Sequence, residues 1–122
     1  MYNLSAPASY TASANVLMLP PGGNGKIFDF DGDNKADLSF WRPDTGAWFV
    51  LRSSDSSVMT QTDFGLGSSG DRIVPGNYDG DTKTDYAYWR PGTGVWTIKQ
   101  STNNQTVTYT LGQSGDLPVQ GD

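Results

Sequence analysis

An internal repeat is the feature that most constrains the fold of this chain. When the sequence is shifted by 48 residues, residues 29–53 align with residues 77–101, and 12 of the 25 aligned positions are identical. The identical positions include the triplets Asp-Gly-Asp and Trp-Arg-Pro, and chance does not produce such a block in register. The chain is therefore expected to contain at least two copies of one structural unit.

A second alignment indicates that the two copies differ in length. Residues 66–76 align with residues 111–121 at a shift of 45, with 7 of 11 positions identical. Because the two shifts, 48 and 45, disagree, we predict a change of length between Ser54 and Phe64, in a Ser-rich loop or at a strand end.

Each copy contains four short segments with the composition of β-strands. The segments are rich in β-branched and aromatic residues, and the residues between them (Gly, Asn, Asp, Ser and Thr) favour turns. No segment has apolar residues at the helical spacing, so helices are not expected. The segments are KIFDF, DLSFWR, AWFVLR and VMTQTDFG in the first copy and RIVPGN, DYAYWR, GVWTIKQ and TVTYTLG in the second.

Four short strands in each 45 to 48 residues is the period of a β-propeller blade. We therefore predict an all-β fold of propeller blades, each with four antiparallel strands. Residues 26–71 would form the first blade, residues 72–116 the second, and residues 117–122 the first strand of a third. Since a blade buries its two faces only against neighbouring blades, we expect oligomerisation or further sequence to complete the ring.

Two acidic segments occupy the same position in the two copies. The first, DFDGDNKAD, spans residues 29–37, and the second, NYDGDTKTD, spans residues 77–85. All 13 acidic residues of the chain are Asp, and the formal net charge is −5. Because more than half of the Asp residues lie in these two segments, the acidity is local, and a bound divalent cation in each segment would neutralise most of it.

The spacing of the acidic residues predicts two Ca²⁺ sites. Alternate side chains of a tight loop can point inward, and the seventh position can add its backbone carbonyl. The chain has no His and no Cys, and ligands that are all oxygen favour Ca²⁺ over Zn²⁺ or copper. The predicted ligands lie at loop positions 1, 3, 5, 7 and 9. They are Asp29, Asp31, Asp33, Lys35 and Asp37 in the first loop and Asn77, Asp79, Asp81, Lys83 and Asp85 in the second.

The loops differ from an EF-hand and from each other. An EF-hand needs a bidentate Glu at position 12, where this chain has Phe40 and Tyr88, and the flanking segments are strands. Asn77 gives the second loop one charge fewer, so we predict weaker binding there.

The two loops resemble the Asp-x-Asp-Gly-Asp-Gly-x-x-Asp motif of FG-GAP/VCBS-type propeller repeats, which occur in integrin α-subunits and in bacterial secreted proteins. The segments WRPDTGAW and WRPGTGVW are similar to the bacterial subgroup. The resemblance covers about residues 26–122. It implies a calcium-binding propeller in which the first, third, fifth and ninth side chains and the seventh carbonyl bind Ca²⁺. The family often has Gly at the sixth position, where a left-handed backbone is easy. Asn34 tolerates that conformation and the β-branched Thr82 does so poorly, so we expect the second site to be strained or differently shaped.

The remaining segments are expected to complete the blades. Residues 1–25 contain the apolar run Val16–Leu19, which we expect to supply a strand to a composite blade with Leu117–Gly121, in the same or another chain. Asp122 aligns with the first position of both loops and is expected to begin a third acidic loop.

Aromatic and Arg residues recur in both copies. Blade-to-blade packing is the expected role of the aromatic residues, and a sugar-stacking platform, as in a lectin, is the alternative. Arg42 and Arg90 are expected to pair with an Asp of a neighbouring blade or to stack on a Trp. The candidate ligand-binding residues are Trp41, Trp48, Trp89 and Trp96.

The composition favours a non-catalytic extracellular module. Without His or Cys the chain lacks the usual general base and thiol nucleophile. Two close carboxylates also serve glycosidases, but a metal site explains these Asp residues better. The net negative charge argues against nucleic acid and anionic membranes as partners. Millimolar extracellular calcium would keep such loops filled, so we expect binding or adhesion outside the cell or at its surface. A lectin and a self-assembling propeller scaffold are the alternatives, with a glycan, a protein or a second copy of the chain as partner.

Overall fold

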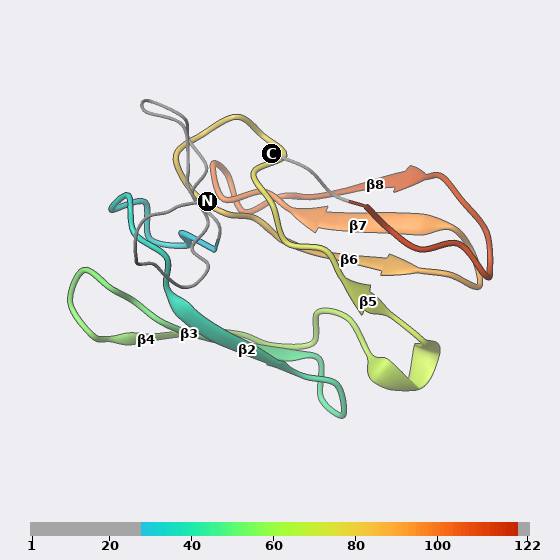
Figure 1. The fold of residues 1–122 in the computed structure, drawn as a ribbon, viewed down its shortest axis with the longest axis horizontal. Coiled ribbons are helices and arrows are strands. Elements are labelled where there is room, and N and C mark those ends of the chain that lie inside the picture. The colour runs from blue at the N-terminus through green and yellow to red at the C-terminus, as the bar shows by residue number, and fades with distance from the viewer. Residues whose placement is uncertain (1–27, 120–122) are drawn as a thin grey trace, which may run out of the picture.

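The computed structural model describes residues 28–119, which form an all-β structure (Figure 1). These residues contain the strands β2 to β8 and one short 3₁₀ turn, η1 (Gly67–Ser69), but no α-helix. The strands form two antiparallel sheets, one of three strands and one of four. Within the described part of the chain, no helix is long and apolar enough to span a membrane.

The first sheet is a simple meander of neighbouring strands. It consists of β2 (Leu38–Arg42), β3 (Ala47–Leu51) and β4 (Val58–Gln61), paired in that order. The turn between β2 and β3 is closed by Gly46, which has a φ of 67°. A Cβ atom on Gly46 would collide with the carbonyl oxygen of Gly65, so this turn requires glycine for both its conformation and its packing.

The second sheet repeats this meander and adds one strand. It consists of β5 (Arg72–Ile73), β6 (Tyr86–Arg90), β7 (Val95–Lys99) and β8 (Thr106–Thr110), paired in that order. Gly94 closes the β6–β7 turn as Gly46 closes the β2–β3 turn, and its Cβ would meet the carbonyl of Gly112. The two sheets are therefore built from the same turn chemistry at the same repeat positions.

Aromatic side chains from one face of β6 join the two sheets. The ring of Tyr86 stacks on Phe30 with centroids 5.1 Å apart, and it meets Trp48 edge-on at 5.3 Å. Tyr88 meets Phe64 edge-on at 5.0 Å. Phe30, Trp48 and Phe64 are all buried, so this face of the second sheet covers the apolar core of the first.

The other face of the second sheet carries an apolar cluster of its own. Its buried members are Val74, Ala87, Trp89 and Ile98, and Trp96 and Val107 pack against them. Because successive side chains of a strand point to opposite faces, β6 contributes to both clusters.

An ion pair fixes the segment that connects the sheets. Arg90, at the end of β6, donates from Nε and Nη2 to the two carboxylate oxygens of Asp71 at 2.7 and 2.8 Å. Asp71 also accepts the N–H of Leu66 at 2.6 Å. The expectation that Arg90 pairs with an Asp is thus confirmed. Its counterpart Arg42 lies over the rings of Phe40 and Phe49, not over a Trp.

The strand registers show where the two copies differ in length. Trp48 lies opposite Gln61 and Trp96 lies opposite Tyr109, so the shift of 48 holds to the end of the fourth strand of each copy. The Ser-rich loop between β3 and β4 therefore has the same length as its counterpart. The prediction of a length change between Ser54 and Phe64 is wrong for the loop and right in part for the strand end, where one residue is lost between Gln61 and Phe64.

The change of length lies after the last strand of each copy. Phe64 donates its N–H to Gly46, and Leu111 donates its N–H to Gly94, both at 2.8 Å, so only one residue has been lost at this point. The remaining difference falls in the following segment, where the first copy forms the turn η1. Sequence identity misplaced the change because it aligned Leu66, and not Phe64, with Leu111.

The structure confirms the all-β prediction and the four paired strands of the second copy. Among the described residues of the first copy, three of the four predicted strands form, because Phe28–Phe30 of the KIFDF segment lead into the acidic loop and are not in a strand. The propeller arrangement remains a prediction. Leu117–Val119 are not in a strand. The run Val16–Leu19, the residues 26–27 of the KIFDF segment and Asp122 lie outside the described residues, as does the rest of the segment 1–25.

Candidate metal centre

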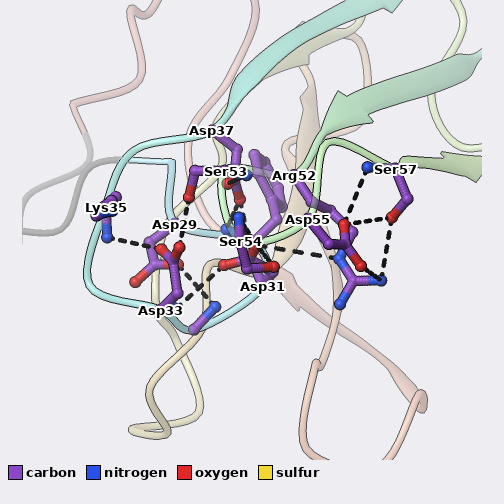
Figure 2. A network of polar contacts seen from close by, with 12 residues as sticks. Asp29, Asp31, Asp33, Lys35, Asp37, Arg52, Ser53, Ser54, Asp55 and Ser57 are labelled. Carbon is purple, nitrogen blue, oxygen red and sulfur yellow. Dashed lines mark hydrogen bonds and ion pairs between the residues drawn. The ribbon is translucent and has the colours of Figure 1, made fainter.

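The first acidic loop brings three carboxylates together (Figure 2). Asp29, Asp31 and Asp37 each offer one carboxylate oxygen, and these oxygens lie within 4.8 Å of one another. Asp29 and Asp37 are buried, with 0% and 5% of their surface exposed. Carboxylates that are this close together and this well buried repel one another, so hydrogen bonds or a cation must compensate their charge.

Backbone N–H groups of the loop supply part of that compensation. Asp29 Oδ1 accepts from Gly32 at 2.7 Å and from Asp33 at 3.2 Å, and its Oδ2 accepts from Asn34 at 2.9 Å. The loop can turn back on Asp29 because Gly32 and Asn34 have φ values of 84° and 75°. Glycine and asparagine tolerate this left-handed backbone, so local sequence folds the loop around its own first carboxylate.

Two hydroxyl residues from the β3–β4 loop complete the first site. Ser53 donates its hydroxyl to Asp33 at 2.7 Å and its N–H to Asp37 at 2.8 Å. Ser54 donates its hydroxyl to Asp31 at 2.7 Å. Figure 2 shows both serines directed at the acidic loop. Hydrogen bonds to ionised groups are the stronger kind, so they hold the carboxylates in place.

The second acidic loop has the same construction. Carboxylate oxygens of Asp79, Asp81 and Asp85 lie within 4.8 Å of one another. Ser101 donates its hydroxyl to Asp81 at 2.6 Å and its N–H to Asp85 at 2.8 Å. Thr102 donates its hydroxyl to Asp79 at 2.7 Å. The acidic loop and the hydroxyl pair therefore recur together in both copies.

The hydroxyl pair was not predicted from the sequence, although the sequence contains a signal for it. Ser53 and Ser101 are identical at the shift of 48, and Ser54 and Thr102 both carry a hydroxyl. The side chains were missed because they lie about 20 residues from the carboxylates that they contact.

The first residues of the two loops differ in their contacts. Asp29 is buried and accepts three backbone N–H groups. Asn77 is exposed; its Oδ1 accepts one N–H, from Gly80 at 2.9 Å, and its amide donates to the carbonyl of Asp81. The sixth positions differ as well, because Thr82 has no positive φ where Asn34 has one. The second loop is thus differently shaped, as predicted, and Thr82 is not strained.

The fifth and seventh positions are less uniform than the spacing predicted. Asp33 is not among the three converging carboxylates of its loop, whereas its counterpart Asp81 is. Lys35 and Lys83 are exposed, and each donates its backbone N–H to the carboxylate two residues earlier, at 2.9 and 2.7 Å. Cation binding by the Lys35 and Lys83 carbonyls remains a prediction.

The carboxylates at the third position are held in the ionised form. Burial acts to raise the pKa of Asp31, but hydrogen bonds from Ser54 and Asp33 and the charge of Arg52 outweigh burial and lower it. Burial likewise acts against Asp79, and the hydrogen bonds from Thr102 and Asp81 lower its pKa. Ionised oxygens are the ligands that a divalent cation requires.

Each acidic loop also affects a neighbouring tyrosine. Burial, with a further contribution from Asp37, raises the pKa of Tyr86 to about 12. Burial and then Asp85 raise the pKa of Tyr78. Burial is the main cause in both cases, and the nearby carboxylate adds to it; Tyr86 packs against the first apolar cluster, whereas Tyr78 belongs to the second loop itself.

The two loops touch each other at the junction of the sheets. Thr84, in the second loop, donates its N–H to the carbonyl of Asp29 at 2.7 Å. The next residue but one, Tyr86, packs on Phe30 of the first loop. A cation that orders either loop would therefore also order the contact between the sheets.

The four Trp residues do not form one surface. Trp48 and Trp89 are buried, with 2% and 1% of their surface exposed, so neither offers a ring face to a sugar. Trp41 and Trp96 are partly exposed and lie against different clusters. Packing thus accounts for two of the four candidate ligand-binding residues.

The donor set of both loops fits a hard divalent cation. The converging atoms are carboxylate oxygens, and the chain has no His or Cys that could add a softer ligand. In each of these carboxylates one oxygen accepts two hydrogen bonds and the other accepts one, so the second oxygen retains a lone pair for a cation. The residues that would hold it are Asp29, Asp31 and Asp37 in the first loop and Asp79, Asp81 and Asp85 in the second.

Comparisons of the chain with protein-family models, with curated proteins and with solved structures gave no match. The assignment of a function consequently depends on the geometry of the two acidic loops.

Proposed function

We propose that this chain is a non-catalytic, calcium-stabilised pair of propeller blades that serves as an extracellular binding or adhesion module. The observation that carries the proposal is that each of the two loops brings three carboxylate oxygens within 4.8 Å of one another. A single acidic turn is common on protein surfaces. Two of them at one repeat position, each with at least one buried Asp and a hydroxyl pair from the next loop, indicate a selected site.

The role proposed for the cation is structural. Asp37 and Asp85 contact both their own loop and the N–H of the β3–β4 or β7–β8 loop. A cation at the carboxylates would remove their mutual repulsion and tie the two loops of each sheet together. Because the unfolded chain has no such site, the free energy of binding becomes free energy of folding.

Calcium is preferred over other hard cations because of the form of the loops. Magnesium demands a small octahedral site and keeps several waters, whereas Ca²⁺ accepts a flexible set of carboxylate and carbonyl oxygens. Extracellular modules of this kind bind calcium in the range of about 0.1 to 1 mM, which matches the calcium outside cells. This match supports an extracellular location.

A lectin function has weaker support than a packing role for the aromatic residues. Trp48 and Trp89 are inside the apolar clusters, and the repeated aromatic positions that remain lie on different faces. We therefore do not propose sugar binding as the function.

Thermal unfolding with calcium and with chelator tests the proposal. At a calcium concentration about 100 times the dissociation constant, each site stabilises the fold by about 2.7 kcal/mol. The melting temperature of the full chain should then rise by roughly ten degrees or more relative to chelator. An equal concentration of magnesium, the control, should give a smaller rise. A melting temperature that chelator leaves unchanged would refute the structural role of calcium.

A further inference from the structure

Exposed residues of β2 in the first sheet correspond to the residues of β6 by which the second sheet packs on the first. At the shift of 48, Leu38 corresponds to Tyr86 and Phe40 corresponds to Tyr88. The two tyrosines fill the junction of the sheets. Leu38 and Phe40 instead have 74% and 54% of their surface exposed. We call Leu38, Phe40 and Arg42 the β2 face.

Arg42 holds the position that Arg90 holds at the internal junction. Its guanidinium lies 5.5 Å from the ring centre of Phe40, and the guanidinium of Arg90 lies 5.5 Å from that of Tyr88. Arg90 also forms the two-pronged ion pair with Asp71. Arg42 is exposed and has no ion pair with any of residues 28–119. The β2 face thus presents the same charge without its partner.

The face of the second sheet that carries Trp96 corresponds to the face of the first sheet that carries Trp48 and takes part in the internal junction. Trp96 and Leu111 correspond to Trp48 and Phe64, since in each pair the Trp Nε1 donates to the carbonyl of the second residue. Phe64 has 8% of its surface exposed, whereas Leu111 has 70%. The difference shows that the internal junction covers Phe64 and that its counterpart Leu111 is left exposed.

This face of the second sheet is hollow and carries a matching acid. A cavity of about 430 Å³ lies between Trp96, Ile98, Val107 and Leu111, and we call these four residues the β7–β8 face. Beside it, Asp116 accepts the N–H of Gln113 at 2.9 Å, as Asp71 accepts that of Leu66. Asp116 is exposed, so its second oxygen is available to an arginine.

We propose that the chain associates head to tail with a second molecule of itself. The β2 face of one molecule docks on the β7–β8 face of the other. Leu38 and Phe40 enter the cavity of the other molecule, as Tyr86 and Tyr88 enter the internal junction. Arg42 pairs with Asp116 of the other molecule. The internal junction therefore serves as the pattern for the external one.

A second molecule of the same chain is the partner that fits these two faces, because the internal junction already joins equivalent faces. Apolar groups, an aromatic-stacked arginine and an aspartate occur on the two faces in the arrangement already joined inside the chain. Such an interface is heterologous, so it closes into a ring if the rotation between copies allows it. Since propellers have about four to eight blades, about two to four copies would complete one. The inference develops the scaffold alternative and does not depend on the proposed binding of calcium.

Reciprocal charge reversal tests the pairing with the full chain. Arg42→Asp places two aspartates at every contact between identical copies, and Asp116→Arg places two arginines there. Each variant alone should associate at least about tenfold more weakly than wild type. An equimolar mixture of the two should recover association, because every contact then joins opposite charges. Sedimentation of a dilution series measures all four samples.

Controls separate this interface from folding and from calcium. Lys99→Asp makes the same change of charge on the opposite face of the second sheet, because Lys99 is paired with Tyr86 in the strand register, and it should associate like wild type. Circular dichroism checks that each variant is folded; if a charge reversal unfolds, Arg42→Gln and Asp116→Asn replace it, and each should weaken association by a smaller factor. Association should persist in chelator even if the loops bind no calcium. A monomeric wild type at every concentration, single variants that associate like wild type, or a mixture that recovers nothing would each overturn the proposal.

Discussion

The two acidic loops have the same outer contacts and different first residues. In both loops a Ser hydroxyl binds the fifth carboxylate and a Ser or Thr hydroxyl binds the third. Yet Asp29 is buried under three N–H groups, whereas Asn77 is exposed and accepts only one. The comparison teaches that the hydroxyl pair defines this loop and that its first residue sets how rigidly the loop is held.

The comparison also changes the reason for expecting weaker binding in the second loop. The sequence predicts weaker binding only from the charge that Asn77 lacks. In the structure, Arg52 Nε lies 3.9 Å from Asp31, and the corresponding residue beside the second loop is the neutral Gln100. The extra carboxylate of the first loop is thus offset by an arginine. The first loop is still expected to bind more tightly, because its first ligand is already held in place.

The largest expected effect separates the first residues of the loops. In chelator, Asp29→Ala should lower the free energy of unfolding by about 3 kcal/mol, since three N–H groups lose their acceptor in a buried site. Asn77→Ala, the matched variant, should cost about 1 kcal/mol because its single N–H partner is exposed. Urea unfolding measures both values. Equal costs would show that the two loops are held alike.

A smaller effect is expected when the second loop is given the first residue of the other. Asn77→Asp adds a carboxylate and should raise the calcium affinity of that loop by about tenfold, or about 1.4 kcal/mol. In chelator the same variant should be less stable than wild type, because the added charge increases repulsion within the loop. Calorimetric titration and urea unfolding check the two signs. A loss of calcium affinity would show that Asn77 is not at the site.

The sixth position should respond in opposite directions in the two loops. Asn34 has a φ of 75°, so Asn34→Ala should cost about 1 kcal/mol and Asn34→Gly should be nearly neutral. Thr82 has no positive φ, so Thr82→Ala should be nearly neutral and Thr82→Gly should cost about 0.5 kcal/mol through added flexibility of the unfolded chain. A stabilising Thr82→Gly would mean that the second loop is strained.

The smallest effect tests the arginine that offsets the first loop. Arg52→Gln gives the first loop the neighbour of the second, and it should raise calcium affinity there by about two- to fivefold, as expected for a half-exposed ion pair. Gln100→Arg should lower the affinity of the second loop by a similar factor. Because screening weakens such pairs, both effects should shrink in high salt. If neither affinity changed, the charge of Arg52 would not reach the site.

Most of the fold was predictable from the sequence, because strands and turns are indicated by residues that are close together in the chain. Strand composition and the glycine turns decided the order of β2 to β4 and of β6 to β8. The position of the length change could not be read from identity, because the similar segments around Leu66 and Leu111 are displaced in the structure. That displacement depends on tertiary contacts of Phe64 and Gly65.

The carboxylates of the site were also predictable, and their partners were not. Alternate Asp residues in a short loop converge for local reasons. Ser53 and Ser101 reach the loops only after β3 and β7 have paired with their neighbours, so no spacing along the chain indicates the contact. Burial of Trp48 and Trp89 likewise follows from packing of the sheets. Their recurrence alone could not distinguish a core from a ligand platform.

Calcium titration of the metal-free chain by calorimetry tests the central claim most directly. We expect each chain to bind two calcium ions, one for each converging carboxylate group. Asp31→Asn and Asp79→Asn are matched variants at the third position, and each should reduce the stoichiometry to one. No binding up to millimolar calcium, or an unchanged stoichiometry in both variants, would contradict the assignment of one cation to each loop.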